Sequence, residues 1–290
     1  ELQYVKSVRY LPTEIKTSLT IKGRVTMDYV DEPDTDVGID PYVANRTSVQ
    51  GTFWKKLIAR NPYYKGRLIK IYQGFLGLAE ADFQQKWQGK IENITIAPDG
   101  TVEIEAADIL QDLTKIQVPT KTNTKLAVSL TATSSNITID RNASAMPASG
   151  YMVIDEEVIQ YSTRSTNTKI FEGITRAVFG TTASTHAEGD KVQACHYYAP
   201  DNPFNILRDQ ILIADGGFAA TSINSTAFDT ERDLIPVETV VSRLVVDPTN
   251  LDDLYWDLMN LVGCRSWVGE DLRVTIARNL PNRPGRTLST

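Results

Sequence analysis

Hydrophobic and polar residues alternate with a period of two over residues 18–30, the pattern of a half-buried β-strand. The same pattern predicts strands over 67–75, 86–97 and 101–107, and the apolar positions change phase between Ile91 and Ile94 as a β-bulge requires. A helix is predicted over 52–60, and Asn61 ends it because a residue before proline avoids helical geometry. We therefore predict that residues 1–117 form one mostly antiparallel β domain with a short helix laid across it.

The composition changes after residue 117 to Thr, Ser, Asn and Ala with short apolar runs, which is typical of a small separate β module. Its four expected strands cover 135–140, 150–162, 168–178 and 190–197. We assign residues 118–197 to this inserted domain.

The last part, residues 198–290, has mixed patterns that predict two helices and a hairpin. The first helix begins at Asn202-Pro203, buries an apolar face and ends at Gly216 in the left-handed conformation. The second helix begins after Thr249 or Asn250 and stops at Gly263, before a hairpin over 264–277. The stretch 217–233 is expected to be an exposed connection, and this domain is expected to be incomplete at its C-terminus.

Together these patterns predict a multi-domain, mainly β protein with α+β elements. Antiparallel β domains of barrel or sandwich type would hold a small inserted β domain.

Charge and hydropathy narrow the classes of function. The formal net charge of −6 disfavours nucleic acid as a bound ligand, because that affinity rests on clustered Lys and Arg. No apolar run approaches the roughly 18 residues of a membrane-spanning helix, so no stable membrane insertion is expected. Cys195 and Cys264 lack metal-ligand spacing and are expected to be two separate buried thiols, although the sequence leaves a disulfide open.

The first candidate for chemistry is His186, which stands two residues before Glu188 in "GITRAVFGTTASTHAEGDKV" (173–192). In zinc deaminases a His-x-Glu is followed by Pro-Cys-x-x-Cys, which this chain lacks. The polar stretch around His186 carries Gly189 and Asp190 and is typical of a turn between strands. We therefore expect no metal or acid–base site here and a turn with His186 at the surface.

Two further pairs were weighed as catalytic groups. Cys195 and His196 are neighbours on an expected strand, where adjacent side chains point to opposite faces and cannot form a thiol–imidazole pair. Glu156 and Glu157 face apart for the same reason, and no motif supplies a second carboxylate to converge with either. No catalytic residue, cofactor or metal is predicted, and the protein is expected not to be an enzyme.

The loop after residue 30 is acidic, with Asp31, Glu32, Asp34, Asp36 and Asp40. It lacks the glycine and the final glutamate of an EF-hand, so a solvated or partner-facing loop is favoured over a calcium site of another type.

Four tryptophans are candidates for a carbohydrate platform, but each lies on the apolar face or in the strand interior of its own element. Core packing is therefore expected for all of them. They are Trp54, Trp87, Trp256 and Trp267.

Three stretches in this order resemble the hub proteins at the tail tip of long-tailed bacteriophages. They are "GTFWKKLIARNPYYKGRLIKIYQGF" (51–75), "GYMVIDEEVIQYS" with "GITRAVFGTTASTHAEGDKVQ" (150–193), and "NPFNILRDQILIADGG" (202–217). The string "RAVFGTTA..H..GD" is less specific alone, since comparable small modules occur in various tail proteins.

The resemblance implies a structural subunit at the virion tail tip, assembled in the bacterial cytoplasm. Its partners would be copies of itself in a ring, commonly a trimer, together with the distal tail, tape-measure and tip or fibre proteins. The ring would close the tail tube around the channel that later passes DNA, and no enzyme activity or cofactor is implied. A glycan-binding or glycan-degrading tail module is the alternative, and a bacterial β protein with segments of prophage origin is a third interpretation.

Overall fold

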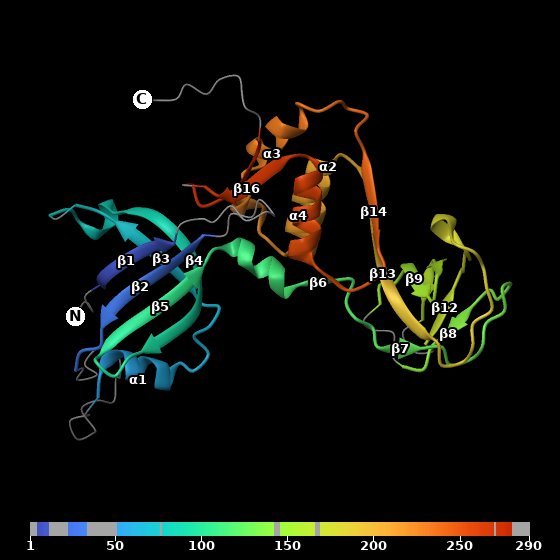
Figure 1. Ribbon diagram of the computed structural model, residues 1–290, viewed down its shortest axis with the longest axis horizontal. Coiled ribbons are helices and arrows are strands. Elements are labelled where there is room, and N and C mark those ends of the chain that lie inside the picture. The colour runs from blue at the N-terminus through green and yellow to red at the C-terminus, as the bar shows by residue number, and fades with distance from the viewer. Residues whose placement is uncertain are drawn as a thin grey trace. The chain divides into compact units, whose positions relative to one another are not determined.

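The computed structural model describes residues 5–11, 23–33, 51–75, 77–141, 146–165, 169–269 and 271–279. Strands hold 41% of the residues and helices 23%, so the chain is mainly β, as the sequence predicts. The chain forms two compact units, Glu1–Gln111 with Arg265–Ile276, and Asp112–Cys264 with Ala277–Thr290. Figure 1 labels the elements of both units.

The first unit contains an antiparallel sheet in the order β1-β2-β5-β4-β3. Its strands are β1 Val5–Leu11, β2 Arg24–Val30, β3 Leu68–Gln73, β4 Gln84–Ile96 and β5 Thr101–Ala107. The predicted bulge in β4 is confirmed, because the pairing with β5 shifts register between Ile91 and Asn93. The alternation in β5 buries Val102, Ile104 and Ala106 in the core of this sheet.

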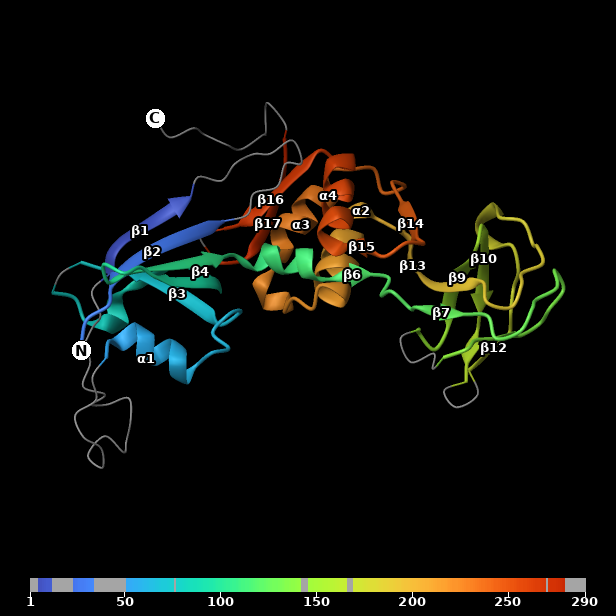
Figure 2. The same ribbon diagram turned by 60° about the horizontal axis from the view of Figure 1, so that its bottom comes forward.

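Helix α1, Phe53–Arg60, confirms the helix predicted over 52–60 and lies against this sheet (Figure 2). Its Trp54 belongs to the hydrophobic core of the sheet. The Trp54 ring lies 4.9 Å from that of Tyr29, measured between centroids. Asp31 holds the start of the helix, since its Oδ1 accepts a hydrogen bond of 2.9 Å from the Trp54 N–H and its Oδ2 one from the Thr52 hydroxyl. The short 3-10 turn η2, Glu80–Asp82, precedes β4.

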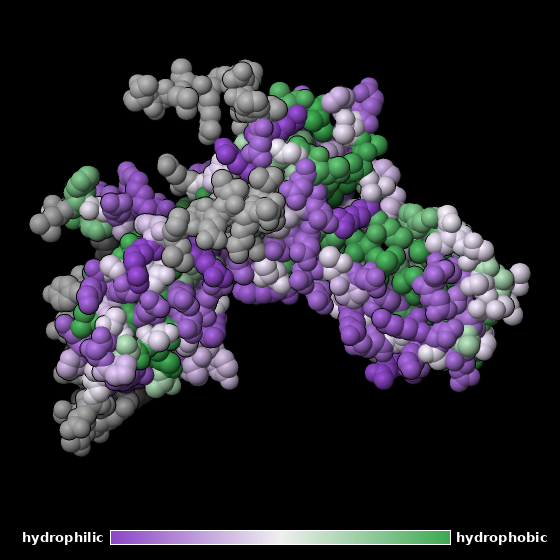
Figure 3. Space-filling model, in the orientation of Figure 1, coloured by the Kyte–Doolittle hydropathy of each residue, from purple (hydrophilic) through white to green (hydrophobic). Residues whose placement is uncertain are grey.

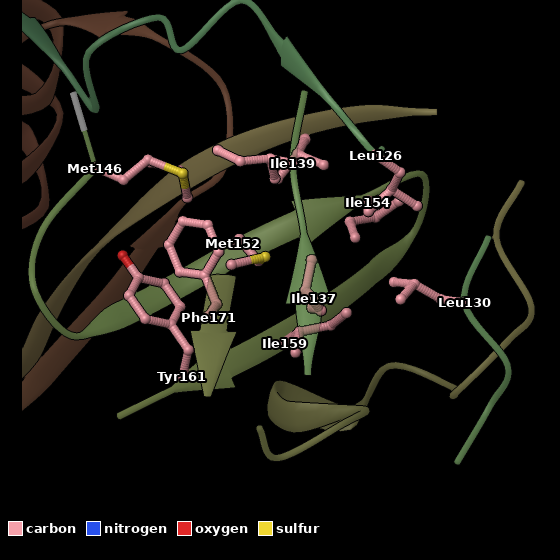
Figure 4. Close-up of a cluster of buried hydrophobic side chains, with 12 residues drawn as sticks. Leu126, Leu130, Ile137, Ile139, Met146, Met152, Ile154, Ile159, Tyr161 and Phe171 are labelled. Atoms are coloured by element: carbon pink, nitrogen blue, oxygen red, sulfur yellow. The ribbon is translucent and has the colours of Figure 1, made fainter. Parts of the chain in front are cut away.

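The next strands are β6 to β13, and buried apolar residues between Leu126 and Ala194 form a hydrophobic core among them. The strands are β6 Gln117–Val118, β7 Thr124–Lys125, β8 Ile137–Thr138, β9 Gly150–Ile154, β10 Glu157–Tyr161, β11 Thr163–Arg164, β12 Ile170–Glu172 and β13 Lys191–Asp201. Figure 4 shows the core side chains meeting between these strands, among them Met152, Ile154, Tyr161 and Phe171.

The stretch 150–162 is a hairpin and not the single strand expected from the sequence. Its two strands, β9 and β10, pair antiparallel from Gly150 with Tyr161 to Ile154 with Glu157. Asp155, with a φ of 52°, and Glu156 form the turn. The run of apolar residues on both sides concealed this turn, because it has neither glycine nor proline.

Strand β13 continues past the expected domain boundary at 197/198. Its first half pairs with β7 and β9, and its second half, from His196, pairs with β14, Val241–Val245. The second unit therefore contains the expected inserted domain together with most of the expected third domain, whereas the hairpin residues 265–276 belong to the first unit.

The second unit contains helices in addition to the two that the sequence predicts. Its helices are α2 Pro203–Asn205, the π-helix η6 Ile206–Asp215, α3 Ser225–Arg232 and α4 Leu251–Leu261, with the 3-10 turns η5 Val178–Gly180 and η7 Ala220–Ser222. The 3-10 turn η3, Ile109–Lys115, begins in the first unit and ends in the second. Asn202 caps α2 as predicted, since its side chain accepts a hydrogen bond of 3.0 Å from the Phe204 N–H. Strand β15, Thr249–Asn250, pairs with β6 just before α4.

Two local predictions in this region are wrong. The stretch 217–233 is not an exposed connection, because it contains α3, in which Phe228 is fully buried. Gly216 has a φ of −76°, and Gly217, at +67°, takes the left-handed conformation after the π-helix. The hairpin predicted near the C-terminus is confirmed as β16 Cys264–Val268 and β17 Val274–Arg278.

None of the helices in the described ranges combines the length and the apolar character that crossing a membrane requires.

Candidate functional site

His186 is buried in the second unit and is not the surface residue that the sequence predicts. It is 3% exposed, and its backbone pairs with that of Leu130 in both directions. The ring Nε2 lies 2.9 Å from Oε2 of Glu157, and Nδ1 lies 2.9 Å from Oδ2 of Asp155. Glu188 is exposed, and its backbone N–H donates to the Ser129 hydroxyl, so the His-x-Glu pair does not converge.

Of the two acidic groups that contact the His186 ring, Glu157 is the more buried, with a side chain that is 0% exposed. Arg176 donates two hydrogen bonds of 2.7 Å to its two carboxylate oxygens, and the N–H groups of Ala177 and Ser184 donate two more. Burial alone would raise the pKa of Glu157, but the hydrogen bonds from Arg176, His186 and Ser184 lower it to about 2. The carboxylate is therefore charged at neutral pH and accepts hydrogen bonds only.

Arg176 also forms hydrogen bonds with two other segments of the chain. Its Nη1 donates 2.6 Å to the carbonyl of Thr131, and its Nη2 donates 2.8 Å to the carbonyl of Ser184. We call Arg176, Glu157 and His186 the buried network. Since removing one partner of a buried ion pair leaves an uncompensated charge, these residues hold each other in place.

The buried network shapes the loop that follows Arg176. Ala177 and Phe179 have φ values of 55° and 56°, in the left-handed region that residues with a side chain rarely adopt. The Thr181 hydroxyl closes the loop by donating to the Val178 carbonyl at 2.9 Å and accepting from the Val158 N–H at 3.2 Å. The buried network and the Thr181 hydroxyl thus hold an uncommon backbone conformation.

Phe179 of this loop forms an aromatic cluster with Tyr151 of β9 and Tyr197 of β13. The ring centroid of Phe179 lies 5.0 Å from that of Tyr151 and 4.8 Å from that of Tyr197. Phe179 remains 45% exposed. An exposed aromatic ring held by a rigid base is suited to contact with another molecule.

A second exposed apolar area lies in the same unit, where a cleft of about 130 Å³ opens between α4, the π-helix and β14. Leu261 at its edge is 68% exposed, and nearby Val240 is 59% exposed. Figure 3 shows hydrophobic residues gathered at the surface between α4 and β14. The cleft is lined by Tyr198, Ile206, Ile211, Val241, Ser242, Arg243, Leu254, Asp257, Leu258 and Leu261. Its polar edge is an ion pair of 3.0 Å between Arg243 and Asp257.

The thiol–imidazole pair weighed in the sequence does not form. Cys195 is buried, and burial raises the pKa of its thiol to about 12, so the nucleophilic thiolate is scarce at neutral pH. The His196 ring points to Asp215, with 3.3 Å between Nε2 and Oδ2. Cys264 is also buried, and neither cysteine is in a disulfide.

Glu156 and Glu157 face apart, as the sequence predicts, although they stand at a hairpin turn and not within one strand. Glu156 is exposed at the hairpin turn, whereas Glu157 is buried at the start of β10. Asp31 is 8% exposed and accepts a hydrogen bond from the Trp54 N–H at the start of α1. Asp34, Asp36 and Asp40 lie outside the described residues. Glu32 is exposed.

The expected core role of the tryptophans is confirmed for Trp54 and Trp256, which are 9% and 5% exposed. Trp87 is half-buried and packs on the core of the first sheet. Trp267 is half-buried with the guanidinium of Arg265 5.5 Å from its ring centroid.

No protein-family model matches the chain, and no curated protein matches it. The buried network is therefore interpreted from its geometry. The sequence did not reveal this network because its members are far apart in the chain. Arg176 is 19 positions from Glu157, and His186 is 29 positions from it. The signal that was available is an arginine among mostly apolar residues, in "ITRAVF" (174–179).

Proposed function

We propose that the chain is a structural subunit of a bacteriophage tail tip, a hub protein that works by contact with neighbouring subunits. The resemblance of residues 51–75, 150–193 and 202–217 to such hubs suggests the class. The observation that carries the proposal is the buried network. Its charged groups bind one another and hold the loop that exposes Phe179.

The donor and acceptor groups of the buried network support a contact role over catalysis. Glu157 accepts five hydrogen bonds from protein groups, and Arg176 donates to four acceptors. A catalytic acid or base must reach the proton that it transfers, and these groups face protein atoms. They are arranged as a support for the loop.

The exposed apolar surfaces support the same proposal. The aromatic cluster and the cleft beside Leu261 place large apolar groups at the surface of one unit. Contiguous exposed apolar groups with a polar edge mark contact sites for other proteins. We infer that these surfaces meet other copies in a ring, commonly of three, and the adjoining tail proteins.

The net charge of −6 is compatible with a ring around a DNA channel, because like charges repel and DNA would pass without adhering. In this proposal the ring closes the tail tube around the tape-measure protein.

Gold-labelled antibodies against the chain, imaged on virions of the phage that encodes it, test the proposal. Labels at the tail tip are the expected result. Labels on the capsid or along the tube wall contradict it. Sedimentation of the full chain at micromolar concentration then measures whether it forms the ring alone or needs its neighbours.

The aromatic cluster also favours one alternative, a glycan-binding tail module, since sugars stack on exposed aromatic rings. Titration with purified envelope polysaccharide and peptidoglycan fragments, followed by tyrosine fluorescence and product analysis, distinguishes the two. Saturable binding or shortening of the glycan supports the module, whereas no signal at millimolar sugar removes it.

A further inference from the structure

One nitrogen of the buried His186 ring faces two aspartates. One ring nitrogen of His186, a carboxylate oxygen of Asp155 and one of Asp190 all lie within 4.8 Å of one another, and Nδ1 is the nitrogen in contact with Asp155. Asp155 stands at the turn between β9 and β10, and Asp190 stands just before β13. This group of three shares His186 with the His-x-Glu pair of the sequence, but Glu188 has no part in it.

The surroundings of the ring fix which nitrogen carries its proton. The carboxylate of Glu157 accepts hydrogen bonds from Nε and Nη2 of Arg176 and has no hydrogen to donate. Nε2 of His186 must therefore donate its hydrogen to Oε2 of Glu157, across 2.9 Å. In a neutral ring Nδ1 then holds a lone pair. That lone pair faces Oδ2 of Asp155, another acceptor, at 2.9 Å. Two acceptors at this distance repel each other unless a hydrogen or a metal ion lies between them.

The charges around the ring are also uneven. Glu157 is balanced by Arg176, with which it forms an ion pair. Asp155 forms an ion-pair contact with the imidazole, and Asp190 accepts a hydrogen bond of 2.7 Å from the Ala187 N–H. Within the described ranges neither aspartate forms an ion pair with lysine or arginine. Two aspartates thus place two carboxylate groups within 4.8 Å of an imidazole nitrogen.

We propose that Asp155, His186 and Asp190 bind one divalent transition-metal ion of the zinc class. An imidazole nitrogen with two carboxylate oxygens suits Zn²⁺, Co²⁺ or Mn²⁺, whereas Ca²⁺ and Mg²⁺ prefer oxygen ligands alone. Water completes the coordination. Glu157 fixes the ring from the other side, the arrangement in which a carboxylate orients a metal-binding histidine and raises its basicity.

The metal has a structural role in this arrangement. It joins the β9–β10 turn to the turn that leads into β13, and both turns adjoin the buried network. Metal that binds the folded chain and not the unfolded one stabilises the fold. The site uses neither the aromatic cluster nor the cleft, so its test does not depend on the proposed function.

The full chain, treated with EDTA and dialysed, is titrated with Zn²⁺ by calorimetry and with Co²⁺ by visible absorption. We expect about one equivalent to bind, a rise in Tm with Zn²⁺, and Co²⁺ bands typical of low-coordinate nitrogen and oxygen ligation. Asp155→Asn and Asp190→Asn each weaken binding by at least about tenfold. Glu188→Gln, an exposed acid in the same turn, leaves binding unchanged. Binding that survives both asparagine variants overturns the proposal, as does no saturable binding of either metal.

Nitrogen NMR of the imidazoles gives a second measurement on the unsubstituted protein, which has only two histidines. We expect one ring to keep a protonated Nε2 while its Nδ1 signal shifts on addition of Zn²⁺. A His186 ring that carries hydrogens on both nitrogens, and stays so when Zn²⁺ is added, shows that a proton fills the place of the metal and overturns the proposal.

Discussion

At the scale of single residues, the buried network explains why an acid can be enclosed in a β module. Glu157 is surrounded by five donors, so its charge is compensated without solvent. Buried charges persist in proteins only with such partners. The consequence is a strong dependence of stability on each partner and on pH.

Replacing Glu157 by Gln is expected to destabilise the second unit by about 3 kcal/mol, because Arg176 would be left buried without its counter-charge. Chemical denaturation monitored by fluorescence measures the change. Glu156→Gln, the exposed neighbour in the hairpin turn, serves as the control and should leave the free energy of unfolding nearly unchanged. Equal losses in the two variants would contradict the role of the network.

The pKa of Glu157 predicts acid sensitivity. Its value falls from an ordinary 4.5 to about 2 in the folded protein. A depressed pKa stabilises the fold above the unfolded value, so this stability is present above about pH 4.5 and is lost as the pH falls toward 2. Denaturation curves between these values should show the loss in the natural protein and a smaller one in Glu157→Gln. Parallel curves for both would refute the assignment.

At the scale of elements, tertiary packing decided what local patterns left open. Helix α3 is short and polar for most of its length, with a Thr and Ser content typical of loops, yet Phe228 and Ile223 anchor it in the core. Asn224 caps it by accepting from the Ala227 N–H at 3.2 Å. The N-cap residue and the helical spacing were the available signals, and the absence of a wide apolar face concealed them.

Asn224→Ala is expected to cost about 1 kcal/mol, because the first turn of α3 loses the acceptor for one of its N–H groups. Thermal unfolding measures it. Thr226→Ala, an exposed position two residues further on, should change the Tm little. A larger effect at Thr226 than at Asn224 would argue against the cap.

Gly89 of β4 allows a close approach of two strands. A Cβ at this position would collide with the Ala107 carbonyl and the Trp87 ring. Gly89→Ala should therefore destabilise the first unit by about 1–3 kcal/mol, the usual result of overpacking. Lys86→Ala on the same strand is the matched control in the same denaturation assay. No difference between the two variants would mean that the strands can separate at little cost.

At the scale of the whole molecule, the exposed apolar groups are the features that bear most on the proposed assembly. The aromatic cluster rests on a loop with two left-handed residues, and the cleft beside Leu261 is open to solvent. A chain that keeps such groups exposed in its folded state would bury them on assembly. Function in the proposed tail tip would then be measured as incorporation and not as turnover.

Phe179→Ser is expected to leave the purified chain folded, because the ring is already 45% exposed, and to reduce its recovery in assembled tails severalfold. Quantitative blotting of purified virions from a complemented deletion measures recovery, and circular dichroism checks the fold. Glu156→Gln, in the same module, should assemble normally. Normal incorporation of Phe179→Ser would remove the aromatic cluster from the proposed interface.

The sequence by itself determined the elements whose signals are local. Alternation gave β2 to β5, the phase change gave the bulge near Ile91, and Asn202-Pro203 placed the start of a helix. Tertiary structure alone decided that β13 runs across two parts of the fold and that His186 lies buried between Asp155 and Glu157. The reason is physical: strand and cap patterns act between neighbours in the chain, whereas the charge that encloses His186 comes from a hairpin about 30 residues away, brought close only when the β module buries its core.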